Sequence, residues 1–296
     1  MMKEINFLKN NYPDKKIKSE TVKNRPIKSK NKVPFENFIN INSKDVAYVL
    51  GFIWADGNIR KPYTISIVIN GKDSEDIKNV FQKSGEWNYY YYDRFDNRTN
   101  KTYKNFQIQT SNKNLVNFLI DNDYDKKSLL SPTKILSKIP EEYKLYFFRG
   151  FSDGDGCFYK KNRASQYSLT GSYFQDWTAV ENLFNLLNIT YTIRYSSNKK
   201  SKYSQIRITN KNDIDIFGKY IYDNFDGTGL KRKYLKYCEI KKISINRIIK
   251  WTDEEITFLK NNYKTSHAKL ALLLNKSRYS IDAKSSKLKL KNSHNF

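Results

Sequence analysis

The feature of this chain that most restricts its fold is an internal repeat with a period of about 100 residues. A helix-like segment over 47–59 is matched by one over 145–159, and the strand-like and helix-like segments after each keep the same order. Asp56 corresponds to Asp155 at an offset of 99 residues, and a similar offset of 98 relates two later strands. This period is too long for a solenoid repeat. We therefore expect an α+β fold in which two pseudo-symmetric αββαββα lobes, each with an antiparallel sheet, are joined in one chain.

The repeat divides the 296 residues into four predicted parts. These are a basic N-terminal arm over 1–44, a first lobe over 45–143, a second lobe over 144–240 and a small helical unit over 241–296.

The last part has the pattern of three short helices. Thr252 is a favourable N-cap with Glu255 three residues later, which is the pattern of a capping box. A second helix is expected over 270–274, a turn over 275–277 and a third helix over 280–290. Together these segments predict an all-α unit of the helix-turn-helix or Myb-like type, whose third helix could enter a major groove.

Lysine and arginine are concentrated at the two ends of the chain. Of a formal net charge of +24, +7 falls within 1–44 and +12 within 231–296. Such an excess indicates a polyanionic partner. Nucleic acid fits better than an anionic membrane, because no strongly amphipathic basic helix is visible. A coding bias toward lysine would not explain why the charge gathers at the ends.

Composition also excludes several classes of protein. The chain has only two Cys and two His, which argues against a disulfide scaffold, a zinc finger and a His-based catalytic triad. It contains no apolar run of about 18 residues, so no membrane span is expected, and its N-terminus does not resemble a secretory signal. We expect a location in the cytoplasm of a phage or bacterial host, or in an organelle matrix, and not outside the cell.

Each lobe begins with a helix-like segment that has small residues on one face. In the first copy Ala47, Gly51 and Ala55 recur every four residues, and in the second copy Gly150 and Gly154 do the same. Small residues at this spacing let two helices approach closely. The sequence therefore predicts that the two segments pack against each other.

Both segments end in Asp-Gly, which suggests a metal site. Asp56 and Asp155 would lie at helix C-termini, where the helix dipole disfavours an anion, and side by side they would repel each other. A shared divalent cation relieves both costs. Oxygen ligands suit Mg²⁺ (or Mn²⁺), which completes its shell with phosphate or water. Paired carboxylates of this kind are typical of phosphodiester hydrolysis.

The two segments, VLGFIWADG (49–57) and FRGFSDGDG (148–156), resemble the nine-residue motif of the LAGLIDADG homing endonucleases. The resemblance covers about residues 45–240. It implies a monomeric, metal-dependent enzyme that cuts double-stranded DNA, with the metal at the eighth motif position, Asp56 and Asp155. Whether a neighbouring backbone carbonyl also binds the metal is left open.

The same resemblance concerns three further residues within the motifs and two lysines outside them. The sixth motif position, often Asp, is Trp54 in the first copy and Asp153 in the second, and Arg149 replaces a small residue. The family places a basic residue near each half of the site, and Lys127 and Lys233 match it. Physically, each lysine could stabilise charge that develops on the phosphate, although an ordinary solvated lysine is an equal alternative.

In this family the sheets lie in the major groove, and here the outward strand positions carry side chains suited to base edges. Gln and Asn pair with adenine and Arg with guanine, so the predicted DNA contacts are Asn105, Gln107, Gln109, Thr192, Arg194, Gln205, Arg207 and Thr209, together with Lys284 and Lys287 of the helical unit. Because the two lobes differ, the target should be long and only partly symmetric.

Two alternatives to an intron-homing endonuclease remain open from the sequence. One is a LAGLIDADG-derived transcription regulator that binds DNA without cutting it. The other is a maturase that binds intron RNA, with or without cleavage of DNA. Metal-dependent nicking would separate the first alternative from the enzyme, and binding to a structured intron RNA would identify the second.

Overall fold

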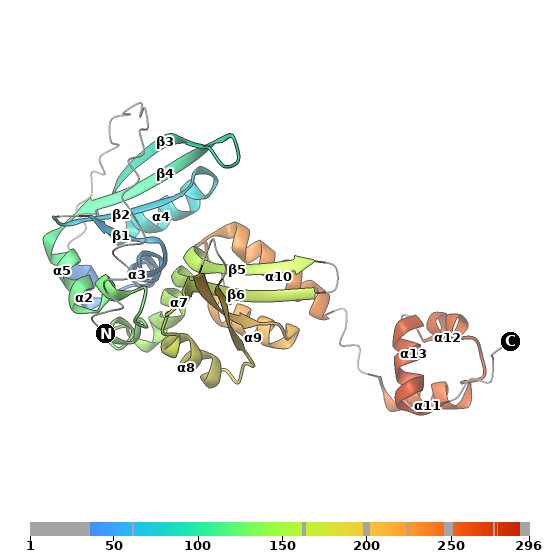
Figure 1. Cartoon of the computed structure of the whole chain (residues 1–296). Helices are drawn as coiled ribbons and strands as arrows, with labels where there is room; N and C mark the ends of the chain where they lie inside the picture. The colour runs from blue at the N-terminus through green and yellow to red at the C-terminus, as the bar shows by residue number, and fades with distance from the viewer. Residues whose placement is uncertain are drawn as a thin grey trace. The chain divides into compact units, whose positions relative to one another are not determined.

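The computed structural model describes residues 36–290 apart from 61, 162–163, 198–201, 224, 246–250, 275 and 277. The chain divides into two compact units, Met1–Lys242 and Ile243–Phe296. The first unit contains both copies of the repeat (Figure 1).

The first lobe has the predicted order of elements, preceded by a short helix α2 (Glu36–Asn40). Its members are α3 (Lys44–Asp56), β1 (Asn58–Arg60), β2 (Thr64–Asn70), the 3₁₀ turn η1 (Gly71–Asp73), α4 (Ser74–Ser84), β3 (Asn88–Asp96), β4 (Lys101–Ser111) and α5 (Lys113–Asp121). All pairings in its sheet are antiparallel, and the strand order is β1-β2-β4-β3.

The second lobe repeats this arrangement. Its members are α7 (Glu141–Asp155), β5 (Gly156–Lys161), β6 (Ala164–Ser172), α8 (Thr178–Leu186), β7 (Thr192–Ser197), β8 (Lys202–Ile208) and α9 (Lys211–Tyr222). The strand order β5-β6-β8-β7 is the counterpart of that in the first lobe. The predicted α+β fold of two αββαββα lobes is therefore confirmed.

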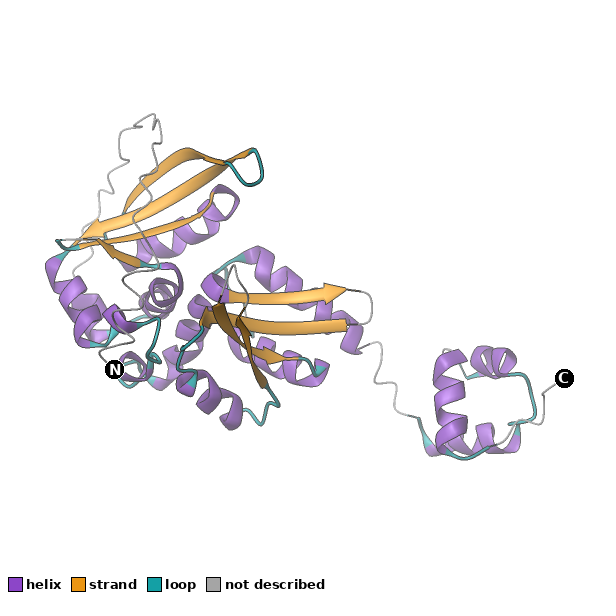
Figure 2. Ribbon diagram, in the orientation of Figure 1, coloured by secondary structure: helices purple, strands orange, loops and turns teal. Residues whose placement is uncertain are grey.

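In each lobe the helices cover one face of the sheet (Figure 2). Strand residues alternate between the two faces, so Phe106 and Ile108 of β4, like Ile206 and Ile208 of β8, turn to the helices and are fully buried. The polar residues between them lie on the opposite face of each sheet.

The centre of the first unit is the contact between α3 and α7. A Cβ atom at Gly51 would lie 2.0 Å from the carbonyl oxygen of Phe147, and one at Gly150 would lie 2.0 Å from that of Tyr48. At each glycine the backbone of one helix contacts the backbone of the other, because no Cβ atom lies between them. The close approach expected from the small residues is present.

Two connecting segments cross between the lobes. After α5 the chain passes through η2 (Tyr124–Lys126) and α6 (Thr133–Leu136), and after α9 it enters α10 (Lys231–Ile245). The Arg232 guanidinium of α10 donates to both carboxylate oxygens of Asp73 in the first lobe, at 2.7 and 2.9 Å. In the reciprocal contact, the Ala179 amide of α8 donates to the Ser131 hydroxyl at 2.8 Å. These exchanged contacts join the two lobes.

The predicted boundaries differ from the structure at two places. The N-terminal arm lies outside the described residues as far as residue 35, but Phe38 and Ile41 are buried in the core of the first lobe, so the stretch before residue 45 belongs partly to that lobe. Helix α10 continues to Ile245, past the predicted end of the second lobe at residue 240. The first difference arises because Phe38 and Ile41 extend the apolar core beyond the repeated pattern.

In its described residues, the second unit contains three whole helices, α11 (Asp253–Asn261), α12 (His267–Leu273) and α13 (Arg278–Lys287). The predicted capping box at Thr252 and Glu255 is present. Helices α12 and α13 begin two or three residues earlier than predicted, and most of the predicted turn at 275–277 lies outside the described residues. Among the residues of this unit that the structure describes, the fully buried apolar side chains are Leu259, Leu270 and Ile281.

Among the helices that the structure describes, none combines the length and the apolar character needed to cross a membrane.

Candidate metal and nucleic-acid site

The two aspartates of the repeated motif lie at equivalent helix ends. Asp56 is the last residue of α3 and Asp155 the last residue of α7, and each is followed by a glycine with extended backbone. The glycine is required for space and not for a left-handed turn, because a Cβ at Gly57 would lie 2.5 Å from both the Ile53 carbonyl oxygen and the Tyr124 hydroxyl. The chain can therefore leave each helix directly into the first strand of its sheet.

The two carboxylates face a common region. A Cβ at Gly154 would lie 2.2 Å from that of Ala55 and 3.3 Å from a carboxylate oxygen of Asp56, so the ends of α3 and α7 touch beside the acids. Burial, and next the charge of Asp56, raise the pKa of Asp155 to about 7. Burial also raises the pKa of Asp56, although this residue is exposed to solvent on one side of the helix pair. Both negative charges are thus costly in the absence of a cation.

The predicted catalytic lysines lie at the same place, one at each helix end. Lys127 donates from Nζ to the carbonyl oxygens of Trp54, Ala55 and Gly57 at 2.9, 2.8 and 2.6 Å. Its ammonium also lies 5.0 Å from the centre of the Tyr124 ring. Because these carbonyls form the negative end of the helix dipole, the lysine acts as a cap for α3.

Lys233 repeats this arrangement on α7. Its Nζ donates to the carbonyl oxygens of Ser152 and Gly156 at 2.9 and 2.7 Å, and also to those of Asp153 and Gly154. Its side chain is buried, and this burial lowers its pKa. Neither lysine is an ordinary solvated side chain.

The charges of the four residues are coupled. Burial lowers the pKa of Lys127 to about 8, and the carboxylates of Asp155 and Asp56 oppose that shift. The charges of both lysines in turn oppose the raised pKa of each aspartate, without cancelling it. The structure therefore brings together all four predicted catalytic residues in one cluster of two acids and two bases.

A metal ion bound by the two aspartates would have to take its other ligands from groups that are not His, Cys, Asp or Glu side chains. Within the described residues, no group of three or more His, Cys, Asp or Glu side chains is placed to hold a metal ion. The Ala55 carbonyl next to Asp56 accepts a hydrogen bond from Lys127, so that oxygen is engaged by a cation already. Two carboxylates, with phosphate and water as further ligands, would fit the donor preference of Mg²⁺.

The sixth motif position has a different environment in each lobe. Trp54 is buried and packs edge-to-face on Tyr124 with ring centres 5.7 Å apart, and the Tyr124 hydroxyl donates to the Ile53 carbonyl at 3.0 Å. Trp54 thus fills space beside the helix pair. Sequence reasoning missed Tyr124, since no periodic pattern marks a tyrosine that reaches a helix end about 70 residues away.

Arg149 points into the second lobe, away from the aspartates. Its guanidinium donates to the carbonyls of Ile221 and Thr228, the latter at 3.0 Å. It also lies over the Tyr146 ring, 4.7 Å from the ring centre. The side chain is fully buried and braces the segment between α9 and α10.

The outer face of the first sheet carries the predicted glutamines in a hydrogen-bonded row. Gln107 donates to Ser66 at 2.9 Å and to Gln109 at 3.0 Å, and Gln109 donates to the Tyr90 hydroxyl at 3.2 Å. These side chains are half-buried and hold one another in position. A ligand on this face would meet an ordered set of donors and acceptors.

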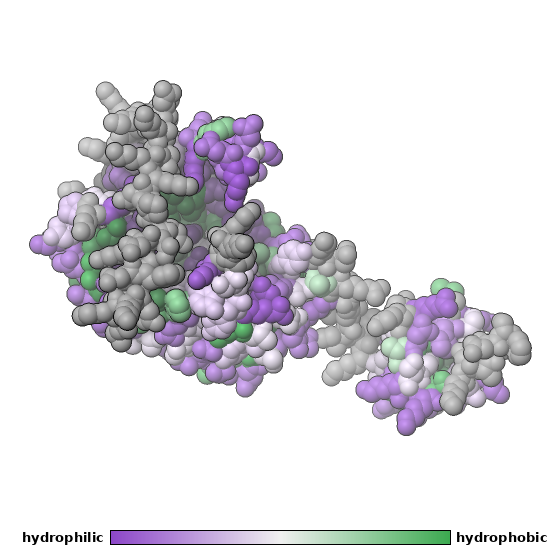
Figure 3. Space-filling view, viewed as in Figure 1, coloured by the Kyte–Doolittle hydropathy of each residue, from purple (hydrophilic) through white to green (hydrophobic). Residues whose placement is uncertain are grey.

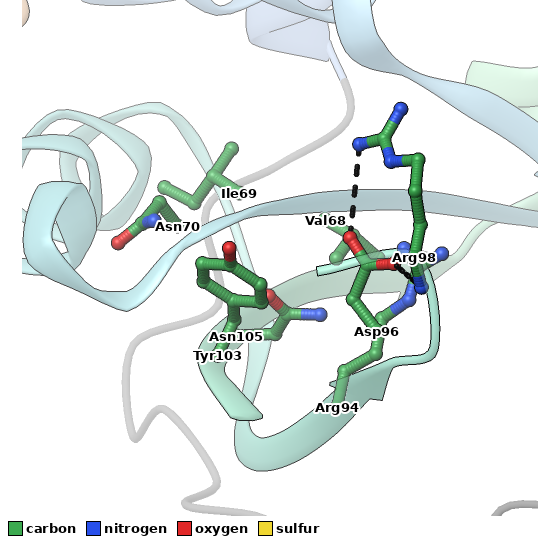
Figure 4. Close-up of a pocket in the computed structure, with 8 residues that line it drawn as sticks. All are labelled: Val68, Ile69, Asn70, Arg94, Asp96, Arg98, Tyr103 and Asn105. Atoms are coloured by element: carbon green, nitrogen blue, oxygen red, sulfur yellow. Dashed lines mark hydrogen bonds and ion pairs between the residues drawn. The ribbon is translucent and has the colours of Figure 1, made fainter. Parts of the chain in front are cut away.

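Asn105 is less accessible than predicted. Its exposed fraction is 9%, and it lines a pocket of about 370 Å³ (Figure 4). Arg94, Asp96 and Arg98 line the same pocket, with the Arg98 amide donating to Asp96 at 2.9 Å. The tip of the β3–β4 hairpin next to it is mostly hydrophilic (Figure 3). Asn105 could contact only a group that enters this pocket.

The second sheet has an equivalent polar row of different charge. Arg207 donates to the Gln205 amide oxygen from Nε at 2.9 Å, and Gln205 donates to the Thr170 hydroxyl at 2.8 Å. Thr192 lies opposite Arg207 on β7, and Arg194 lies opposite Gln205. Thr209 is exposed but lies one residue beyond the end of β8, so it is not part of the strand as predicted.

The two predicted lysines of the second unit differ in accessibility. Lys287 is exposed at the end of α13, whereas Lys284 is half-buried with its ammonium 5.7 Å from the centre of the Trp251 ring. Lys276 approaches the same ring at 5.1 Å and also pairs with Glu255. Lys284 is therefore partly engaged within its own unit.

The second lobe has a counterpart among known protein families. Residues 142–222, which span the second lobe from α7 to α9, match a family described as a LAGLIDADG-like domain. No curated protein sequence matches the chain.

Several solved structures are similar to the chain. The homing endonuclease I-WcaI bound to its DNA recognition sequence is 17% identical over 71% of this chain and 94% of its own, with a TM-score of 0.46. The I-LtrWI LAGLIDADG homing endonuclease bound to target DNA is 17% identical over 76% and 97%, with a TM-score of 0.42. Full-length DUF199/WhiA from Thermatoga maritima is 14% identical over 86% and 92%, with a TM-score of 0.41.

Proposed function

We propose that this protein is a site-specific endonuclease that cuts both strands of a DNA duplex with a divalent metal ion. The observation that carries the proposal is the pair of coupled carboxylates, Asp56 and Asp155, on two helices that touch, each with a lysine at the helix end. Two polar sheet faces flank this cluster. The basic ends of the chain supply the affinity for a polyanion that such a substrate requires.

Asp56 and Asp155 would hold the metal, which we expect to be Mg²⁺ or Mn²⁺. The two residues fit that role, because their oxygens are hard ligands and burial raises the pKa of both carboxyl groups, a cost of ionisation that an added positive charge would offset. A divalent cation there would stabilise the charge that develops on the phosphate during hydrolysis.

The other residues of the cluster have a positioning and an electrostatic role. Lys127 and Lys233 bind the last carbonyls of α3 and α7 and would thereby keep the two carboxylates in position. Their positive charges would also stabilise the negative charge of a phosphate placed between the lobes. Because each lobe has its own aspartate and lysine, one lobe would direct the cut in each strand.

The sheets would bind the DNA and select its sequence. Gln107 and Gln109 in the first lobe, and Gln205 and Arg207 in the second, would meet base edges in the major groove. The three-helix unit would add contacts to flanking DNA, through Lys287 above all. We infer that a single chain suffices, since both halves of the site are present in it, and that the biological role is the homing of an intron or another mobile element.

The test is nicking of a randomised duplex library in Mg²⁺, with Asp56→Asn and Asp155→Asn as matched variants. Recovered ends that share one long site, and that both variants lose, are the expected result. Binding of duplex DNA without any cutting in Mg²⁺ or Mn²⁺ would refute the endonuclease and leave a regulator. Preferential binding of a structured intron RNA would instead indicate a maturase.

A further inference from the structure

A buried carboxylate beside the proposed metal site has no part in the chemistry described above. Asp153, at the sixth position of the second motif, is 2% exposed. It accepts three hydrogen bonds of 2.8 Å, from the hydroxyls of Tyr48 and Tyr222 and from the backbone amide of Leu230. These donors come from α3, from α9 and from the turn before α10. Asp153 therefore ties three separate segments to the end of α7.

The turn that Asp153 holds follows a path determined by close contacts. Gly229 has φ of +128°, a conformation that favours glycine. A Cβ at this position would lie 2.8 Å from the Asp153 carboxylate and 3.2 Å from the Arg149 side chain. Arg149 also binds the carbonyl of Thr228 in the same turn. The turn thus lies directly on the acid and on the arginine.

This turn delivers Lys233 to the helix end. Leu230, whose amide binds Asp153, accepts through its carbonyl from the amides of Lys233 and Tyr234 at 3.0 and 3.2 Å. It therefore forms the first turn of α10. From there the Lys233 side chain reaches back to the last carbonyls of α7. A shift of Leu230 would move Lys233, and with it the end of the helix that carries Asp155.

The first lobe holds its equivalent lysine by another means. At the position of Asp153 it has Trp54, which packs on Tyr124, and Tyr124 lies under the ammonium of Lys127. Ring packing therefore supports one half of the site, and hydrogen bonds to a buried carboxylate support the other. A change at either position should disturb one half more than the other.

We propose that Asp153 is a positioning residue for the half of the site formed by Asp155 and Lys233, and that Trp54 is its counterpart for the half formed by Asp56 and Lys127. This inference rests on the proposed endonuclease function. It adds that the two halves depend on different supports, so that cleavage of the two strands can be uncoupled by changes that touch neither aspartate nor lysine.

The experiment compares Asp153→Leu with Trp54→Leu in the full chain. Leucine has nearly the shape of aspartate but no oxygen, so the Leu230 N–H loses its acceptor. Hydrogen exchange without metal should then show the Leu230 amide exchanging roughly tenfold faster or more in Asp153→Leu, and unchanged in Trp54→Leu. With each strand of the selected duplex carrying its own label, the ratio of nicking rates should shift in opposite directions in the two variants. Tyr222→Phe, which removes one donor and leaves the acid in place, should give a smaller shift in the direction of Asp153→Leu.

Two results would overturn the inference. One is a Leu230 amide that exchanges as in the wild type in Asp153→Leu. The other is faster exchange together with an equal loss of nicking on both strands, which would mean that the residue only stabilises the fold. If the wild type does not nick DNA at all, the proposed function fails, and the exchange measurement alone decides whether Asp153 holds the turn.

Discussion

Replacement of Lys127 by Met tests whether this lysine holds the end of α3. Methionine retains the unbranched apolar stem but removes three hydrogen bonds of 2.6–2.9 Å to backbone carbonyls. A hydrogen bond that involves a charged group contributes about 1.5–3 kcal/mol. The loss should be well below three times that value, because the site is partly open and water can reach the carbonyls. We expect the free energy of unfolding to fall by about 2–4 kcal/mol.

The neighbouring Lys126 provides a matched control. It is exposed at the end of η2, so Lys126→Met removes the same charge and should change stability by no more than about 0.5 kcal/mol. Thermal unfolding followed by near-UV circular dichroism in EDTA measures both variants without a contribution from metal. For a unit of this size, a loss of 2–4 kcal/mol lowers the melting temperature by roughly 4–16 °C. Equal melting temperatures for the two variants would refute the capping role, even if Lys127→Met no longer nicked DNA.

Three further outcomes are expected. The pKa of Asp155 in the folded chain, about 7 against an ordinary 3.8, means that the fold binds this proton more tightly than the unfolded chain does. The free energy of unfolding of the metal-free protein should therefore fall as pH rises from about 4 to about 7. In Asp155→Asn, denaturant titrations at several pH values should show a smaller change of this free energy with pH. Gly150→Ala places a methyl against the Tyr48 carbonyl and should cost about 1–3 kcal/mol or more, whereas Glu142→Ala on the exposed side of the same helix should unfold like the wild type. Arg207→Ala should relax base preference at one position by about 1–3 kcal/mol, measured by sequencing of selected duplexes, and a uniform loss of affinity across all sequences would indicate a phosphate contact instead.

Much of the architecture could be predicted because it depends on local patterns that occur twice. Alternating apolar residues placed the strands, the near-constant offset paired the lobes, and the small residues Gly51 and Gly150 predicted the helix contact. The capping box at Thr252 is local as well, since its two partners are three residues apart. The juxtaposition of Asp56 and Asp155 followed from these features, because helices that pack along matched faces bring matched ends together.

The sequence alone thus determined two lobes, their order of elements and the pair of acids. Only the tertiary structure decided how those acids are supported. Lys127 binds carbonyls 70–73 residues earlier, Arg149 turns into its own lobe, and Asp153 gathers donors from three segments. Such contacts depend on the path of a non-repeating turn over a helix end. No short-range periodicity encodes that path, because the partners meet only after both lobes have folded.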